Sequence, residues 1–255
     1  MNTLQEKEQK LCDFLAEKEN IAIAFSGGVD SAYLLYAAKK SGVRVKAYYV
    51  KTAFQPQFEL EDAKRLAKEL DVEMQILPVD VLSAKIITDN PANRCYYCKQ
   101  KIFGTILAQT VADGFAYLAD GTNASDQVSD RPGMKALQEL SVLSPLRICD
   151  LAKQEVRDLS RAADLFTWNK PSYACLATRI PTGVEITAEK LERTEKAEDY
   201  LMQLGFTDFR VRLLGNAAKL QIRAEQFPLL TEKREKIVST LKEWYSDVLV
   251  DLEVR

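Results

Sequence analysis

The sequence predicts an α/β fold in which a parallel, doubly wound sheet is followed by a small α+β domain. In the amino-terminal part of the chain, short apolar runs alternate with segments of helical periodicity. This alternation is typical of parallel strands joined by right-handed crossovers. Beyond a stretch that ends at Gly183, the order changes to helix, strand, strand, helix and strand. We therefore predict one domain over residues 1–183 and a second, smaller domain over residues 184–255.

The first predicted strand, residues 20–25, ends in five consecutive apolar residues and stops before Ser-Gly-Gly. This run is too short for a buried helix and is apolar on both faces, which is typical of a strand inside a parallel sheet. Further strands are predicted at residues 43–50, 72–79 and 115–119, and a short strand or extended stretch is predicted at residues 142–146. Apolar residues at helical spacing predict helices near residues 4–15, 30–40, 58–70, 93–111 and 151–163.

The second domain is predicted from the same two periodicities. Its helices are expected at residues 188–204 and 226–242, and its strands at residues 209–214, 218–222 and 247–252. Before it, residues 168–183 show no clear periodicity, and prolines and a glycine surround Cys175. We predict an ordered loop for this stretch.

The composition excludes several classes of function. Among 255 residues, 47% are hydrophobic and 28% are charged, and the net charge of −2 gives no broad basic surface for nucleic acid. No apolar run approaches the length of a membrane span and the polar start is unlike a signal peptide, so we expect a cytoplasmic protein. The absence of histidine excludes Ser-His-Asp and Cys-His catalysis and every histidine-ligated metal site.

Residues 26–31, Ser-Gly-Gly-Val-Asp-Ser, lie between the first predicted strand and an apolar helix start. The glycines allow a tight turn with exposed backbone N–H groups, and a helix beginning near Asp30 directs its positive end toward the loop. Gly-Gly alone would indicate only an ordinary turn, but the complete motif predicts an anion site. No Gly-x-x-x-x-Gly-Lys-Ser/Thr motif is present, which excludes a kinase-type P-loop.

The motif resembles the pyrophosphate loop, or PP-loop, of the N-type ATP pyrophosphatases, which cleave ATP between its α and β phosphates. The resemblance implies that Ser26, Gly27, Gly28, Asp30 and Ser31 bind ATP. It also implies that Asp30 helps to place a magnesium ion between the outer phosphates. The fold expected from it is the PP-loop type of parallel sheet.

Five cysteines in a chain without a secretion signal are more typical of thiols or metal ligands than of disulfides. Cys95 and Cys98 begin a predicted helix and are compatible with helix packing, a structural zinc site or a redox pair. With Cys175 as a third ligand, they would also suit an iron-sulfur cluster that has one open iron. Cys175 is either a buried small apolar residue or a functional thiol whose pKa Lys170 and Arg179 would lower.

Five motifs together resemble the LarE family, the sulfur-inserting enzymes in maturation of the nickel-pincer nucleotide cofactor of lactate racemase. They are residues 26–31, Asp120-Gly121-Thr122-Asn123 with Asp126, Arg131-Pro132-Gly133, residues 175–183, and Arg210-Val211-Arg212. The resemblance covers nearly the whole chain. It implies an ATP-dependent sulfurtransferase that adenylates a carboxylate of pyridinium-3,5-biscarboxylic acid mononucleotide and converts it to a thiocarboxylate. It also implies a homo-oligomer, with substrate binding and oligomerisation in the small domain.

The resemblance implies roles for single residues as well. Gly121 joins the ATP-binding residues, and the catalytic residues are Cys175, Asp30 and Arg179. The anionic groups of the substrate are bound by Arg179, Glu198, Arg210 and Arg212, because a guanidinium pairs well with phosphate and carboxylate oxygens. Without the resemblance, Arg210 and Arg212 would be predicted on a solvated strand face and Glu198 on a helix surface.

Two sulfur sources follow from the resemblance. In one, the cysteine at the position of Cys175 gives up its own sulfur and becomes dehydroalanine. In the other, three cysteines hold a 4Fe-4S cluster whose open iron carries a sulfide. Because Cys95 and Cys98 are present, we predict the cluster, with Cys175 as third ligand and a sulfide or cysteine-derived sulfur donor.

Three alternative functions remain open. The chain could be a PP-loop tRNA thiolase with an iron-sulfur cluster, although it is slightly acidic and shows no recognisable RNA-binding extension. It could be an amidating ligase that uses free ammonia, since no glutaminase part is recognisable. From a different class, it could be a nucleotide-binding sensor or sulfur carrier without turnover.

Overall fold

The computed structural model describes residues 3–126 and 132–253, so Arg131 of the family motif lies outside the described residues. The chain forms two compact units. The first contains Met1–Thr52, Gln57–Val81 and Asn93–Lys170, and the second contains Ala53–Pro56, Leu82–Ala92 and Pro171–Arg255. The predicted division at residue 183, and the roles predicted for the smaller domain, stay predictions.

The first unit contains a four-stranded sheet of order β3-β2-β1-β4. Its strands are β1 (Asn20–Ala24), β2 (Arg44–Lys51), β3 (Met74–Pro78) and β4 (Leu118–Ala119). All of its ladders are parallel, with Ala24 opposite Tyr48 and Ile23 opposite Ala119. Every residue of β1 except Ala24 is buried, as predicted from its apolar run. The predicted parallel sheet is confirmed.

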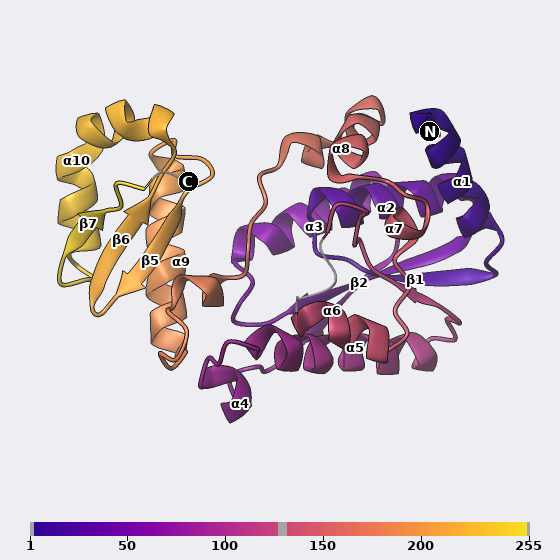
Figure 1. Cartoon of the computed structure of the whole chain (residues 1–255), viewed down its shortest axis with the longest axis horizontal. Helices are drawn as coiled ribbons and strands as arrows, with labels where there is room; N and C mark the ends of the chain where they lie inside the picture. The colour runs from indigo at the N-terminus through magenta and orange to yellow at the C-terminus, as the bar shows by residue number, and fades with distance from the viewer. Residues whose placement is uncertain (1–2, 127–131, 254–255) are drawn as a thin grey trace. The chain divides into compact units, whose positions relative to one another are not determined.

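Helices cover both faces of this sheet (Figure 1), so the fold is doubly wound. Helices α2 and α3 lie on one face, and α5 and α6 lie on the other. The helices of this unit are α1 (Leu4–Ala16), α2 (Val29–Ser41), α3 (Gln57–Glu69), α5 (Arg94–Ala112), α6 (Pro132–Glu139), α7 (Pro145–Ile148), α8 (Lys153–Ala162) and the 3-10 helix η1 (Phe166–Asn169). The described part of the chain holds no helix with the length and apolarity needed to cross a lipid bilayer.

Residues 142–146, predicted as a short strand or extended stretch, form no continuous strand. Leu143 makes a single parallel bridge to Ala119, in which the Leu143 N–H donates to Leu118 O and the Asp120 N–H donates to Leu143 O. Pro145 then begins α7. Proline has no N–H to donate to a ladder but is well suited to the first turn of a helix, so the strand ends after one residue.

The second unit contains a three-stranded sheet of order β5-β6-β7, in which β5 and β6 are antiparallel and β6 and β7 are parallel. Its strands are β5 (Arg210–Leu214), β6 (Ala217–Gln221) and β7 (Val248–Val250), and its helices are α4 (Lys85–Thr88), α9 (Ala188–Gln203), α10 (Phe227–Leu241) and the 3-10 helices η2 (Leu176–Arg179) and η3 (Ala224–Gln226). The helix and strand order predicted after residue 183 is confirmed.

The carboxyl ends of β1 and β4 are neighbours in the sheet, although the two strands are far apart in sequence. The strand order reverses its direction between them, and ligands of open parallel sheets bind at such a switch point. The loop after β1 and the loop after β4 meet here, because Gly121 lies directly against the backbone of Ser31. A Cβ atom at Gly121 would lie 2.7 Å from Ser31 N and 3.1 Å from Asp30 C.

The carboxyl end of α5 is tied to β2 through Asp113. Its Oδ2 accepts hydrogen bonds from Lys46 Nζ at 2.7 Å and from Tyr48 Oη at 2.7 Å, and its Oδ1 accepts one from Gln109 Nε2 at 2.8 Å. These donors, Lys46 first, lower the pKa of Asp113 from 3.8 to about 2.

We predict that Gly121→Ala destabilises the protein by about 1–3 kcal/mol, because the new methyl group meets backbone atoms that cannot rotate away. The matched control is Gly104→Ala in α5, where a Cβ meets nothing within 4 Å. That substitution should stabilise by roughly 0.5–1 kcal/mol through helix propensity. Urea unfolding of both variants measures the difference. Equal effects at the two positions would contradict the close contact at Gly121.

We predict that the charge of Asp113 makes stability sensitive to acid. Since the folded-state pKa lies below the ordinary value, the stabilisation is complete above about pH 4 and is lost as the pH falls toward 2. Asp113→Asn should therefore unfold at a lower temperature near neutral pH and lose less stability between pH 4 and 2 than the native chain. Thermal unfolding followed by circular dichroism over this range tests the prediction, and parallel curves for the two proteins would contradict it.

Candidate functional site

The loop at residues 26–31 is closed by its own serines. Ser26 Oγ and Ser31 Oγ lie 3.0 Å apart, and Ser31 Oγ donates to Gly28 O at 3.2 Å. Gly27 has a φ of 74°, which favours glycine, and a Cβ there would meet Glu59 O at 3.2 Å. Helix α2 begins at Val29, and its N-cap Gly28 makes no side-chain hydrogen bond to the first turn. The N–H groups of this turn are therefore available to an anion.

Asp30 brings together groups from three parts of the first unit. Its Oδ2 contacts Lys153 Nζ on α8, and its Oδ1 accepts a hydrogen bond from Asn123 Nδ2 at 3.3 Å. Asp126 Oδ2 in turn accepts a hydrogen bond from Asn123 N at 3.0 Å. Burial raises the pKa of Asp30, the charge of Lys153 opposes that rise, and the nearby Asp126 adds to it. The loops after β1 and β4 thus place two carboxylates near one lysine.

Lys153 was not among the residues predicted for the site. It occupies the first position of α8, where the positive end of the helix disfavours a cation. A lysine in that position signals a specific anionic partner, and here the partner is Asp30. The lysine is also tied to the loop after β4, because its backbone N–H donates to Ser125 Oγ at 3.0 Å.

The donor set beside the loop suits a magnesium ion. Asp30 and Asp126 supply carboxylate oxygens, which are the ligands that Mg²⁺ prefers. Burial is the main cause of the raised pKa of Asp30, with a smaller contribution from the charge of Asp126, and a bound divalent cation would favour the charged carboxylate.

Lys170 lies against the same loop. Its Nζ pairs with Asp62 Oδ2 on α3 at 2.7 Å and lies 3.4 Å from Gly27 O. A lowering of the pKa of Cys175 by Lys170 was predicted from their closeness in sequence. The structure gives the Lys170 ammonium an ion pair within the first unit, and its effect on the pKa of Cys175 stays a prediction.

Cys175 starts the 3-10 helix η2 in the second unit, and its side chain is half-buried. Its carbonyl accepts hydrogen bonds from Thr178 N at 2.9 Å and Thr178 Oγ1 at 2.8 Å. The next residue is fixed as well, because Leu176 N donates to Phe54 O at 2.9 Å. The predicted ordered loop around Cys175 therefore contains a helical turn with defined backbone hydrogen bonds.

Asn90 holds the chain that follows this turn. It is 1% exposed and has a φ of 54°. Its Nδ2 lies 3.3 Å from Ile180 O, 2.8 Å from Pro181 O and 3.1 Å from Val184 O. Sequence reasoning missed Asn90, because nothing in its surroundings indicates a partner about 90 residues away.

Arg179 and Glu198 form an ion pair in which each side chain is 1% exposed. Arg179 Nε donates to Glu198 Oε1 at 2.8 Å, and Nη2 donates to Oε2 at 2.9 Å. Glu198 therefore does not lie on the helix surface. The signal was the spacing of the buried residues of α9, since Leu191, Thr194 and Leu201 share one helical face with Glu198.

Arg210 and Arg212 contact the segment that carries Cys175. Arg210 is 4% exposed, and its Nη2 donates to Ser172 O at 2.6 Å. Arg212 is half-exposed, and its Nη1 donates to Thr178 O at 3.0 Å. The solvated strand face expected without the family resemblance is wrong for Arg210. Substrate binding by these arginines and by Glu198 stays a prediction.

Cys95 and Cys98 lie in the first two turns of α5 in the first unit, where Cys95 is exposed and Cys98 is half-buried. Cys175 belongs to the second unit. Over residues 3–126 and 132–253, no three Cys, Asp or Glu side chains are grouped so that they could hold a metal ion. The iron-sulfur cluster and its three ligands stay a prediction.

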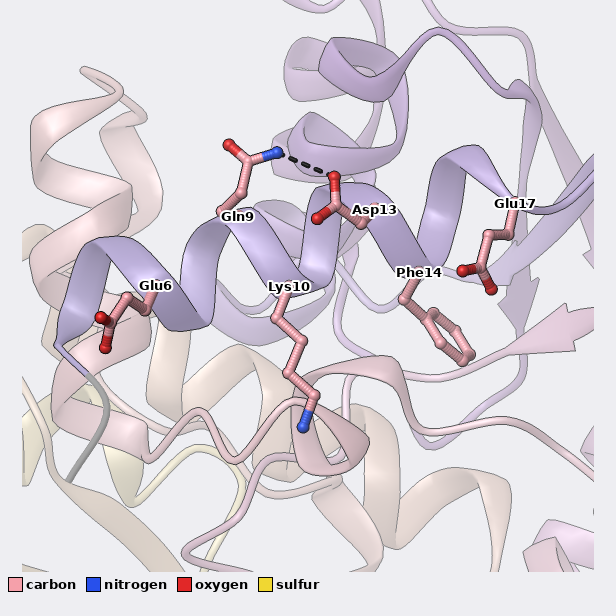
Figure 2. Close-up of a pocket in the computed structure, with 6 residues that line it drawn as sticks. All are labelled: Glu6, Gln9, Lys10, Asp13, Phe14 and Glu17. Atoms are coloured by element: carbon pink, nitrogen blue, oxygen red, sulfur yellow. Dashed lines mark hydrogen bonds between the residues drawn. The ribbon is translucent and has the colours of Figure 1, made fainter.

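A shallow hollow on α1 is not part of this site. Figure 2 shows that the side chains lining it all come from that one helix, and the only hydrogen bond drawn between them joins Gln9 Nε2 to Asp13 Oδ1 at 2.8 Å. The lining residues are Glu6, Gln9, Lys10, Asp13, Phe14 and Glu17. Apart from Phe14, the lining side chains are exposed and carry a charge or an amide, which indicates an ordinary helix surface.

Comparison with known proteins supports the reading of the loop. The family model of the queuosine biosynthesis protein QueC matches residues 20–92, a range that contains β1 and the loop at residues 26–31. A more distant relative is the tRNA-specific 2-thiouridylase MnmA of Thermotoga sp., which is 28% identical over 195 residues, or 59% of this chain and 54% of that protein.

Two relatives match over most of both chains. An uncharacterized protein of Synechocystis sp. is 37% identical over 227 residues, which cover 88% of this chain and 84% of that protein. The pyridinium-3,5-bisthiocarboxylic acid mononucleotide synthase of Lactiplantibacillus plantarum is 31% identical over 224 residues, which cover 87% of this chain and 81% of that protein. Together with the loop geometry, this similarity shows that the chain belongs to the LarE family of pyridinium-3,5-bisthiocarboxylic acid mononucleotide synthases.

Proposed function

We propose that the protein converts a carboxylate of pyridinium-3,5-biscarboxylic acid mononucleotide into a thiocarboxylate, with ATP as the activating substrate. The product class is that named for the relative from Lactiplantibacillus plantarum. By the family resemblance, the product is a precursor of the nickel-pincer nucleotide cofactor of lactate racemase. The proposal includes action as a homo-oligomer.

The observation that carries the proposal is the meeting of Asp30, Asn123 and Lys153 at the carboxyl ends of β1 and β4. Backbone N–H groups in the first turn of α2 would supply donors for phosphate oxygens, and Lys153 would supply a cation beside them. Asp30 and Asp126 would hold magnesium, which would neutralise charge on the outer phosphates. A loop with these groups suits an anion whose charge grows during the reaction.

The first step in the proposed reaction is adenylation. A carboxylate oxygen of the substrate attacks the α-phosphorus of ATP, and the bond to the bridging oxygen breaks with release of pyrophosphate. Negative charge accumulates on that leaving group, so residues 26–31 and Lys153 act where the charge develops. The carboxylate becomes an acyl-adenylate, whose AMP is a far better leaving group than an oxide.

The second step transfers sulfur to the acyl carbon. A sulfur nucleophile attacks the mixed anhydride, the bond to the AMP oxygen breaks, and a thioacid sulfur takes its place. We propose that Cys95, Cys98 and Cys175 would hold a 4Fe-4S cluster, which would supply this nucleophile as sulfide and would be reloaded from sulfide or a cysteine-derived donor. Half-exposed Arg212 is proposed to pair with an anionic group of the substrate.

A second candidate, thiolation of tRNA, is favoured by the similarity to the thiouridylase MnmA. The chain spans only 54% of that relative, whereas it spans 81% of the mononucleotide synthase. Salt-dependent tRNA binding with a thiolated base as product would replace the proposed substrate.

We predict that the purified protein releases pyrophosphate from Mg-ATP when pyridinium-3,5-biscarboxylic acid mononucleotide is present. Lys153→Met should lower the rate by about 10²–10³, because one donor to the developing charge is lost. Lys64→Met is the matched control, since Lys64 is an exposed residue of α3 that forms a surface ion pair with Glu61. The rate of this variant should stay at the native value. Absence of release by the native protein would refute adenylation.

We predict that protein prepared without oxygen and supplied with iron and sulfide absorbs in the visible range and retains all five cysteine sulfurs after turnover. Cys95→Ser should lose the absorption, and Cys12→Ser, a half-buried cysteine on α1, should keep it. Intact-protein mass spectrometry is the deciding measurement. Loss of one sulfur from Cys175 after a single turnover would show sacrifice of the side chain and contradict the cluster.

A further inference from the structure

The carboxylate of Glu198 has all of its hydrogen-bonding positions filled inside the second unit. Oε1 accepts from Arg179 Nε at 2.8 Å and from Val211 N at 2.9 Å. Oε2 accepts from Arg179 Nη2 at 2.9 Å and from Tyr173 Oη. A carboxylate offers about four lone-pair directions, so these donors saturate it. Since the side chain is also 1% exposed, Glu198 has no capacity left for a substrate group.

The other end of the Arg179 guanidinium points to the segment that carries Cys175. Nη1 donates to Ala174 O at 2.7 Å and to Thr178 Oγ1 at 2.9 Å, and lies 3.4 Å from Cys175 O. Arg179 therefore bridges a fixed carboxylate on α9 and the carbonyls on both sides of the Cys175 peptide. Because α9 is a helix of 16 residues, the bridge ties the Cys175 segment to a rigid element.

Tyr173 packs against the same arrangement. Two guanidinium groups contact its ring, with Arg179 Cζ 4.5 Å and Arg210 Cζ 5.0 Å from the ring centroid. Arg210 also binds Ser172 O, the carbonyl directly before Tyr173. The contacts with two cations and the hydrogen bond from Oη to Glu198 restrain the ring. Tyr173 is two residues from Cys175, so its position limits that of the thiol.

We infer that Tyr173 and Glu198 are positioning residues for sulfur transfer, which hold the backbone of Cys175 through Arg179, and that neither binds the substrate. This inference rests on the proposed function, because it assigns the second step of that reaction to Cys175. The predicted role of Glu198 as a substrate ligand and the inferred positioning role lead to opposite kinetic results.

The test compares Tyr173→Phe with the native chain in pyrophosphate release and in thiocarboxylate formation, both followed within a single turnover so that the two steps are resolved. Tyr173→Phe keeps the ring that contacts the two guanidinium groups and removes the hydrogen bond from Oη to Glu198. Thiocarboxylate formation should slow by about tenfold, in line with loss of one charge-assisted hydrogen bond. The KM values for ATP and the mononucleotide and the rate of pyrophosphate release should stay within about twofold. Tyr200→Phe is the control, because Tyr200 lies on α9 with Glu198 and its exposed hydroxyl is 3.4 Å from Lys236 O. Both of its rates should match those of the native chain.

Amide hydrogen exchange supplies a readout that needs no substrate. The N–H groups of Leu176 and Thr178 donate to Phe54 O and Cys175 O, and they should exchange faster in Tyr173→Phe and in Glu198→Gln than in Tyr200→Phe. A raised KM for the mononucleotide in Glu198→Gln with unchanged exchange would overturn the inference. Equal slowing of pyrophosphate release and thiocarboxylate formation in Tyr173→Phe would also overturn it. If the native chain released no pyrophosphate, the proposed function would fail. The exchange data would still decide whether Tyr173 and Glu198, through Arg179, hold the backbone at Cys175.

Discussion

The contact between Gly121 and the backbone of Ser31 is the constraint on which the first unit's site depends. The loops after β1 and β4 lie so close together that a Cβ atom on Gly121 would be 2.7 Å from Ser31 N. This approach lets Asn123, two residues further on, reach Asp30. If the loops lay further apart, Asp30 would lose its hydrogen bond from the Asn123 side chain and its proximity to the Asp126 carboxylate.

Sequence reasoning predicted the parts of the fold that local periodicity determines. The buried strand β1, the loop after it and the helices on both faces follow from runs of apolar residues and from glycine. Residues 142–146 were predicted as a short strand or extended stretch from their apolar character. That prediction did not take into account that Pro145 cannot donate to a strand ladder and begins a helix. Short elements such as β4, with two residues, depend on their neighbours for pairing and have a weak signal of their own.

The candidate site was predictable where motif and position agree, and less so where partners are distant in sequence. Residues 26–31 carry their chemistry in a continuous stretch. Lys153 lies 123 positions from Asp30, and its only local sign was a cation at a helix start. The burial of Glu198 had a local sign in the spacing of α9, but a charged residue on a buried face needs a partner that the helix itself does not show. That partner, Arg179, lies 19 positions away.

The pairing of Lys153 with Asp30 means that the pyrophosphate loop carries its own counter-ion. When an anionic nucleotide binds together with a cation, Lys153 can exchange Asp30 for a phosphate oxygen while the cation takes its place on the carboxylate. Binding then replaces one ion pair by others within a partly buried site, where salt screens charges less than on an open surface. Nucleotide affinity at this loop should consequently depend only weakly on ionic strength. A site whose cation has no ion-pair partner before the anion binds should depend on it more strongly.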